Sequence, residues 1–496
     1  MPVCAGTFKL EEATIDQMQK AMTDGILTSQ QLVMCYMQRT FQTQEYISSV
    51  MQLNPDVMTI AAERDKQRKA GQVLGPLHGI PFTVKDNIAT KDSMETTAGS
   101  YALLGSIVPR DAFVVARLRA AGAVLFGKST MSEWAEGYSP RGGQPRSPYN
   151  LVFNPMGSSS GIVVGAAANA IAFSLGTETD GSVISPAHKN GVVGIKPTVG
   201  LTSRDGVISE CEHQDTVGTF GRTVQDTVYA LDAIYGIDPR DNYTDAQCGK
   251  TPPSGGYAQF LTNKTSLCNA TFGTPWYSFW NISNAETKAQ LDGLITLIQE
   301  NGGTIVNFTE ITDHEKVVNK TGWDWNWQGK IGGYPFNGSY TMSGRYKAYH
   351  GLPAFRSGQD GFLMSNETQG DQNDTYWKAL DYMQTTTRVG IDGALSYNGT
   401  RLPGLLVPVS VAQTYQIAAQ AGYPMITIPA GIYTDTGMPF GLGIMQTAFA
   451  EGELVRWASA IEDLQLKSGT SFKRTRPKWL RHLERPIPID RELKGN

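Results

Sequence analysis

Three residues have types and positions that together could cleave an acyl bond. Lys85 follows the mostly apolar run 79–84, and Ser182 follows Ser158 by 24 residues. A serine hydroxyl is a weak nucleophile until a base takes its proton. A lysine, with a reference pKa of about 10.4, becomes such a base when burial favours its neutral form. We therefore expect Lys85 to take a proton from Ser158, which takes one from the attacking Ser182.

The surroundings of these residues resemble the motifs of the amidase signature family. The resemblance extends over residues 75–445 and includes the segments 84–87, 157–161, 176–186, 194–198 and 214–218. Three correctly ordered motifs at the family's spacing are a strong signal, whereas each motif alone would be weak. The segment 176–182 looks most like the peptide amidase branch and its fungal relatives.

The resemblance implies a fold and a reaction. The fold is α/β, a single layered α/β/α domain with a large mixed β-sheet flanked by helices. The reaction is hydrolysis of a linear amide through a Ser–cis-Ser–Lys triad formed by Ser182, Ser158 and Lys85. An acyl-enzyme forms, and a carboxylic acid and an amine or ammonia are released. No metal or cofactor is expected, because the serine and the lysine supply the nucleophile and the base.

The resemblance also implies the rest of the site. The peptide bond at Ser158 is expected to be cis. The loop around Ala135 corresponds in position to the family's loop on the acyl side of the substrate pocket, so we expect it to line that side. The oxyanion hole is expected from the backbone amides of Thr179, Asp180, Gly181 and Ser182.

Several positions depart from the family pattern. Met156 and Ser160 replace two glycines of the serine-rich motif, and Ile184 replaces the usual arginine after the nucleophile. Glu178 replaces an aspartate, and Asp180 replaces the first of two glycines before the nucleophile. An aspartate at the position of Asp180 is familiar in the peptide amidase branch. The catalytic trio is left intact.

Other polar residues near the motifs are expected to play supporting roles. Asp86 should hold local structure and influence Lys85, and Glu178 should support the loop before the nucleophile rather than react. His188 and His213 flank motifs, so they either adjoin the site or are ordinary polar residues in loops.

Three other functions each fit part of the sequence. Residues 157–161 match the G-x-S-x-G nucleophile elbow, which would make Ser159 the nucleophile, but Pro155 interrupts the strand that an elbow requires. That scheme has no use for Lys85. A glutaminase subunit of an amidotransferase would need partner subunits. A non-catalytic binding glycoprotein on the same scaffold would not retain the trio.

Size and composition bound the remaining choices. The chain has 496 residues, a net charge of −4 and no basic run, which argues against a nucleic-acid partner. No apolar stretch is long enough for a membrane span. The expected partner is a small-molecule or peptide amide substrate, and the expected state is a monomer or homodimer.

Within one amidase domain, 1–496, we distinguish N-terminal helices (1–70), the signature core (75–235), an elaborated substrate-pocket region (240–400) and a C-terminal core and tail (403–496).

Local patterns predict the elements that position the trio. Thr14 with Gln17, and Thr28 with Gln31, form two capping boxes. The remaining predictions are strands over 79–84, 123–126, 425–428 and 440–445 and helices over 112–121, 161–172 and 452–465. The aromatic segment 323–327 either lines the pocket or packs a loop onto the core.

Ten Asn-x-Ser/Thr sites lie after residue 240, which favours a glycoprotein of the secretory pathway over a cytoplasmic protein with Asn-rich loops. These asparagines are Asn242, Asn263, Asn269, Asn281, Asn307, Asn319, Asn337, Asn366, Asn373 and Asn398. Among the five cysteines, Cys248 and Cys268 are close enough in sequence to form a bridge.

Overall fold

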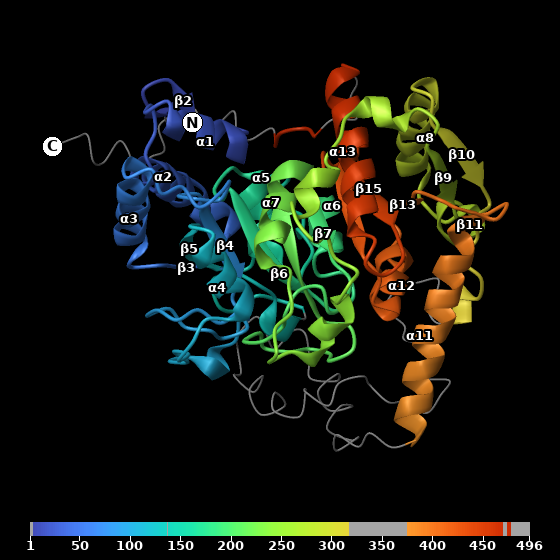
Figure 1. Cartoon of the computed structure of the whole chain (residues 1–496), viewed down its shortest axis with the longest axis horizontal. Coiled ribbons are helices and arrows are strands. Elements are labelled where there is room, and N and C mark those ends of the chain that lie inside the picture. Colours follow the sequence, from blue (N-terminus) through green and yellow to red (C-terminus); the bar gives the residue numbers. More distant parts are fainter. Residues whose placement is uncertain (1–2, 136, 317–373, 470–473, 478–496) are drawn as a thin grey trace.

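An eleven-stranded mixed β-sheet runs through the molecule (Figure 1). The computed structural model describes residues 3–135, 137–316, 374–469 and 474–477. Across the sheet the strands follow the order β10-β9-β13-β15-β14-β7-β8-β6-β4-β5-β3. Their bounds are β3 Val50–Leu53, β4 Pro81–Lys85, β5 Val124–Ser129, β6 Phe173–Glu178, β7 Val193–Lys196, β8 Thr216–Gly221, β9 Thr271–Thr274, β10 Thr304–Asn307, β13 Leu405–Pro408, β14 Met425–Ile432 and β15 Pro439–Met445.

Two short antiparallel pairs and eleven α-helices accompany the sheet, together with seven short 3₁₀ or π helices among the described residues. The pairs are β1 (Val3–Ala5) with β2 (Phe8–Lys9) and β11 (Ser396–Tyr397) with β12 (Thr400–Arg401). The helices are α1 Ile15–Thr23, α2 Ser29–Ile47, α3 Val57–Lys69, α4 Phe113–Ala120, α5 Ser160–Ala167, α6 Ile184–Lys189, α7 Val224–Ile234, α8 Ala285–Glu300, α11 Asp374–Ala394, α12 Gln413–Ala421 and α13 Glu451–Lys467.

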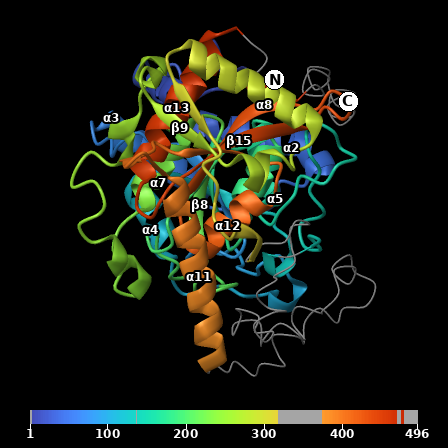
Figure 2. The same cartoon turned by 90° about the vertical axis from the view of Figure 1, so that its right-hand side faces the viewer.

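Helices cover both faces of the sheet, which gives the expected α/β architecture. Helices α7, α8 and α13 pack on one apolar face, and α5, α6 and α12 pack on the other. The alternation of side chains along β13 shows why both faces are apolar: Leu405 and Val407 join one core cluster, whereas Leu406 joins the other. Figure 2 shows α11 extending beyond this layered body. None of the helices in the described ranges is both long enough and apolar enough to cross a membrane.

The elements predicted around the motifs are present. Both capping boxes form, at Thr14 and Thr28. Strands β4, β14 and β15 and helix α13 occupy the predicted segments. The helix predicted over 161–172 ends at Ala167, because Asn169 adopts a left-handed conformation with φ 59°. Strand β6 then begins at Phe173.

The region 240–400 contributes to the main sheet. Its strands β9 and β10 pair in parallel, and β9 joins β13. The aromatic segment 323–327 lies outside the described residues, so the choice between pocket and packing stays a prediction.

The cysteine pairing differs from the one that sequence proximity favoured. A disulfide joins Cys4 of β1 to Cys35 of α2, whereas Cys248 and Cys268 are free and exposed. Folding places β1 beside α2, and this tertiary contact brings together two cysteines that are 31 residues apart.

Candidate active site

The sheet topology brings the three predicted catalytic residues together. Lys85 is the last residue of β4, which runs parallel to β6, with Val84 opposite Leu175. Because parallel strands end at the same edge of a sheet, Lys85 lies beside the turn that follows β6 and carries Ser182. Ser158 immediately precedes the turn into α5, and the Gly157–Ser158 peptide bond is cis, as the resemblance implies.

The three side chains form a continuous hydrogen-bonded chain. Lys85 Nζ lies 2.7 Å from Ser158 Oγ, and Ser158 Oγ lies 2.8 Å from Ser182 Oγ. The exposed fractions are 0% for Lys85, 2% for Ser158 and 9% for Ser182. The most accessible member is therefore the predicted nucleophile, and the least accessible is the predicted base.

Burial prepares Lys85 to accept a proton. Its Nζ also lies 3.0 Å from Thr177 O and 2.8 Å from Thr177 Oγ1. Desolvation lowers the pKa of Lys85 to about 8. The charges that oppose this shift belong to Glu210, Asp215 and Glu178. A substantial fraction of the lysine is thus neutral at mildly alkaline pH.

Glu178 fixes the turn that carries Ser182. Its Oε2 accepts hydrogen bonds from the backbone amides of Val183 (2.7 Å) and Ile184 (2.9 Å). Burial raises the pKa of Glu178, and the buried ammonium of Lys196 opposes that rise. The expected supporting role of Glu178 therefore has a geometric basis: the carboxylate holds the two residues that follow Ser182.

The backbone beside Ser182 is shaped by Gly181 and Tyr415. Gly181 has φ 123°, and a Cβ at this position would lie 2.6 Å from the aromatic ring of Tyr415 in α12. Within the described part of the chain, the amides of Thr179 and Ser182 donate to no other backbone group. The Gly181 amide also lies near the Glu178 carboxylate.

A pair of carboxyl groups adjoins the segment before Ser182. Thr179 Oγ1 lies 2.7 Å from Asp215 Oδ1 and 2.8 Å from Glu210 Oε2. Asp215 Oδ2 accepts from the backbone amides of Glu210 (2.7 Å) and Cys211 (2.9 Å). Glu210 was not predicted from the sequence, because it lies outside all the segments that resemble the family motifs.

The loop that carries Ala135 is tied to Ser158. Ala135 N donates to Ser132 O at 3.0 Å, and Ser132 N donates to Ser158 O at 3.1 Å. This path connects the predicted acyl-side loop to the catalytic chain. By contrast, the hydroxyl of Ser159, the nucleophile in the elbow scheme, is directed to Thr177 O at 3.4 Å.

Asp86 has a different neighbour from the one expected. Its carboxylate accepts from the backbone amides of Thr97 (3.2 Å) and Gly99 (2.9 Å), so it does hold local structure. Burial raises the pKa of Asp86, and the leading charge that opposes this rise is the buried ammonium of Lys128. Asp86 is absent from the charges that act on Lys85.

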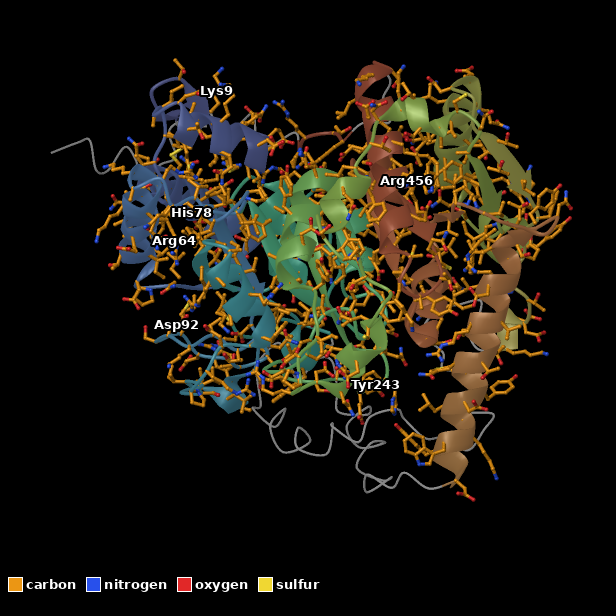
Figure 3. The ribbon with its side chains drawn as sticks, viewed as in Figure 1. Lys9, Arg64, His78, Asp92, Tyr243 and Arg456 are labelled. Carbon is orange, nitrogen blue, oxygen red and sulfur yellow. A yellow bond between two sulfur atoms is a disulfide. The ribbon has the colours of Figure 1, made fainter. Side chains whose placement is uncertain are left out.

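His213 links the loop after β7 to helix α11. Its Nδ1 lies 2.6 Å from the hydroxyl of Tyr243, labelled in Figure 3, and its Nε2 lies 2.6 Å from the hydroxyl of Tyr376. His188 is buried within α6, where desolvation lowers its pKa. Neither histidine is bonded to the catalytic chain; His213 instead anchors α11.

Comparison with known proteins places the chain among amidases. Residues 31–331 match the family model described as Amidase. The chain is 49% identical to a putative amidase of Schizosaccharomyces pombe, with 99% of this chain and 90% of that protein covered. It is 36% identical to a probable amidase of Arabidopsis thaliana, with 93% and 92% covered.

Solved structures give the same result. The native peptide amidase from Stenotrophomonas maltophilia superposes with a TM-score of 0.77 at 33% identity, covering 94% of this chain and 98% of that one. A glutamyl-tRNA(Gln) amidotransferase component from Symbiobacterium thermophilum is 39% identical in sequence, but over only 52% of this chain and 54% of its own length.

Proposed function

Because the chain belongs to the amidase family and is an amide hydrolase, we propose that it cleaves its substrate through Ser182, Ser158 and Lys85. The observation that carries this assignment is the unbroken path of two short contacts, 2.7 Å and 2.8 Å, from a buried lysine to the more accessible of the two serines, Ser182. The lowered pKa of Lys85 supports its role as the base.

The reaction proceeds in two stages. Ser182 Oγ attacks the amide carbonyl carbon, its proton passes to Ser158, and the Ser158 proton passes to neutral Lys85. The C–N bond then breaks, and the proton returns along the same path to the leaving nitrogen. This leaves an acyl-enzyme on Ser182, which water hydrolyses to the carboxylic acid with the same three residues moving the proton.

The negative charge that develops on the carbonyl oxygen requires hydrogen-bond donors. We assign these donors to the backbone amides of Thr179, Asp180, Gly181 and Ser182. Loss of one such donor typically reduces kcat by about 100- to 1000-fold. The loop around Ala135, through its bond path to Ser158, is assigned to the acyl side of the pocket.

The substrate class follows from the relatives by analogy. Solved relatives at 33% identity are peptide amidases, so we propose C-terminal peptide amides as the first class to test, followed by small aryl or alkyl amides. The whole triad comes from one chain, so catalysis is consistent with a monomer or homodimer. The glutaminase alternative predicts activity on glutamine that depends on partner subunits.

The assignment is tested with a panel of peptide amides, anilides and glutamine. Wild type should hydrolyse at least one amide and react with a fluorophosphonate, whereas Ser182→Ala and Lys85→Met should lose activity by at least about 1000-fold. Ser159→Ala is the matched control, because its hydroxyl lies outside the catalytic path. Full activity in Ser182→Ala with loss in Ser159→Ala would refute the nucleophile assignment. Absence of both labelling and turnover in wild type would favour a silent binding protein.

We also propose that the protein is a glycoprotein of the secretory pathway. The six acceptor asparagines within the described residues are all exposed: Asn242, Asn263, Asn269, Asn281, Asn307 and Asn398. The other four, Asn319, Asn337, Asn366 and Asn373, lie outside the described residues. The Cys4–Cys35 disulfide agrees with an oxidising compartment. A bare polypeptide mass for the protein from its native source would contradict the proposal.

A further inference from the structure

A large hollow lies at the β10 edge of the main sheet. Its volume is about 710 Å³, and its walls come from β10, the start of β9 with the residue Asn269 before it, and the β11–β12 hairpin with the two residues that follow it. Figure 1 shows these elements together at one end of the molecule, away from β4 and β6.

Strand β10 is an open edge of the sheet, and all four of its residues line this hollow. It is the terminal strand of the sheet, and in the part of the chain that the structure describes it pairs with β9 alone. Ile305 and Val306 are only half-buried, and Thr304 and Asn307 are exposed. An exposed edge with free N–H and C=O groups is a template for pairing with a strand of another chain.

Three glycosylation acceptor sites converge on the same hollow. Asn269, Asn307 and Asn398 all line it, although they precede β9, end β10 and form the hairpin turn, respectively. All three are exposed. Two of the required hydroxyl residues, Thr271 and Thr400, also line the hollow, and Thr309 completes the third site.

We propose that Asn269, Asn307 and Asn398 carry N-linked glycans that cover the β10 edge and prevent its pairing with other chains. The proposal rests on the secretory assignment and is independent of the catalytic one. In the modification, the asparagine Nδ2 forms a bond to C1 of an oligosaccharide while the bond from C1 to the phosphate oxygen breaks. The donor is a lipid pyrophosphate-linked oligosaccharide, the lipid pyrophosphate leaves, and the amide nitrogen loses one proton.

The bulk and polarity of a glycan suit this role. Oligosaccharides attached around an edge occupy the space that an added strand would need, and they are strongly hydrated. Six strands separate β10 from β6 in the sheet. At about 4.8 Å per strand spacing, the edge lies roughly 34 Å from the strand that leads to Ser182. Changes at the edge should therefore leave catalysis unaltered.

Replacing the threonines tests the proposal without altering the asparagines. The combined variant Thr271→Val, Thr309→Val and Thr400→Val destroys all three acceptor sites and keeps the β-branched shape that strands favour. Thr309 Oγ1 is buried and has no hydrogen-bond partner among the described residues, so valine fits that position. The matched control, Thr271→Ser, Thr309→Ser and Thr400→Ser, retains the acceptor sites.

Wild type, the valine variant and the serine control are each produced as the full chain by secretion from a eukaryotic host. Wild type is also isolated from its native source. Peptide N-glycosidase digestion in heavy-oxygen water marks each occupied asparagine, and sedimentation velocity reports association. We expect occupancy of all three sites in wild type and the serine control. The valine variant should show none, with at least a tenfold larger associated fraction and unchanged amide hydrolysis. Native removal of the glycans from folded wild type should produce the same association.

Three outcomes would overturn the proposal. Occupancy at other acceptor sites but not at these three would refute it and leave the secretory assignment standing. A bare polypeptide from the native source would refute both, while amide hydrolysis would still stand. Occupied sites whose loss, by variant and by enzyme, leaves the protein monomeric would refute the shielding role.

Discussion

The hydroxyl of Thr179 lies 2.8 Å from the carboxylate of Glu210, at the start of the segment that leads to the nucleophile. The same hydroxyl lies 2.7 Å from Asp215. A hydroxyl has one hydrogen, so the two carboxylates share it in a three-centre hydrogen bond. Burial raises the pKa of Asp215, because desolvation disfavours its charged form. These two acids contribute the leading negative charges that act on Lys85.

The first prediction concerns the pH dependence of the wild-type enzyme. Lys85 must be neutral to accept a proton, and its pKa is lowered to about 8. We therefore expect kcat/KM to rise with pH and to level off above about 8, with a loss of about tenfold per pH unit well below that value. The measurement is kcat/KM for one amide from pH 5.5 to 9.5 at constant ionic strength. A flat profile over this range would exclude a lysine base with this pKa.

Glu210→Gln should move that profile. Glu210 raises the pKa of Lys85, so removal of its charge should lower that pKa further and shift the rising limb toward acid. The glutamine amide can donate to Thr179 Oγ1 while Thr179 donates to Asp215, so the contacts are preserved. At pH 6.5 we expect kcat/KM to increase by about three- to tenfold, with little change on the plateau.

The control for this variant is Glu212→Gln. Glu212 is an exposed acid on the same loop and is not among the groups that shift the pKa of Lys85. Its profile should superimpose on that of wild type. A Glu210→Gln profile that also superimposes would show that Glu210 does not set the charge state of the base.

The catalytic chain could be predicted from sequence because each member has its own local motif. The apolar run before Lys85 marks a strand end, and the small residues around Ser158 and Ser182 mark tight turns. The parallel pairing of β4 with β6 then brings these turns together. The fold class followed from the same motifs, since they resemble one family of proteins.

The remaining parts of the site depend on contacts that no local pattern records. Tyr415 reaches Gly181 only because α12 packs over the turn, and Glu210 reaches Thr179 only through the loop geometry after β7. The same reason explains the cysteines: proximity in sequence favoured Cys248 with Cys268, but tertiary packing pairs Cys4 with Cys35.

Glu178→Gln should separate the positioning of the nucleophile from global stability. The amide would weaken the bonds to Val183 and Ile184 and remove a charge that faces the buried Lys196. We expect kcat to fall by about 10- to 100-fold with a smaller change in KM, and the free energy of unfolding to fall by roughly 1–3 kcal/mol. Steady-state kinetics and urea denaturation measure the two effects.

Glu451→Gln is the matched variant for this test. Glu451 also faces Lys196, and its Oε1 accepts from Thr198 N at 2.7 Å, but it makes no contact with the turn around Ser182. It should reduce stability by a similar amount and retain kcat within about twofold. Equal losses of kcat in both variants would mean that Glu178 acts only through stability. In that case Glu178→Asp, which has the residue usual in the family and keeps the charge, would show no gain in kcat over Glu178→Gln beyond its gain in stability.

Gly181→Ala should lower kcat more than the addition of one methyl group suggests. An added Cβ would lie 2.6 Å from the Tyr415 ring, and φ 123° is a conformation that L residues rarely adopt. The turn must shift, which displaces both Ser182 Oγ and the amides assigned to the oxyanion. We expect kcat to fall by about 100- to 1000-fold, the loss typical of a missing oxyanion donor. Gly249→Ala is the control, since Gly249 also has a positive φ (71°) but nothing within 4 Å of an added Cβ. It should keep full activity, and a Gly181→Ala enzyme as active as this control would show that the turn tolerates displacement and does not supply the oxyanion donors.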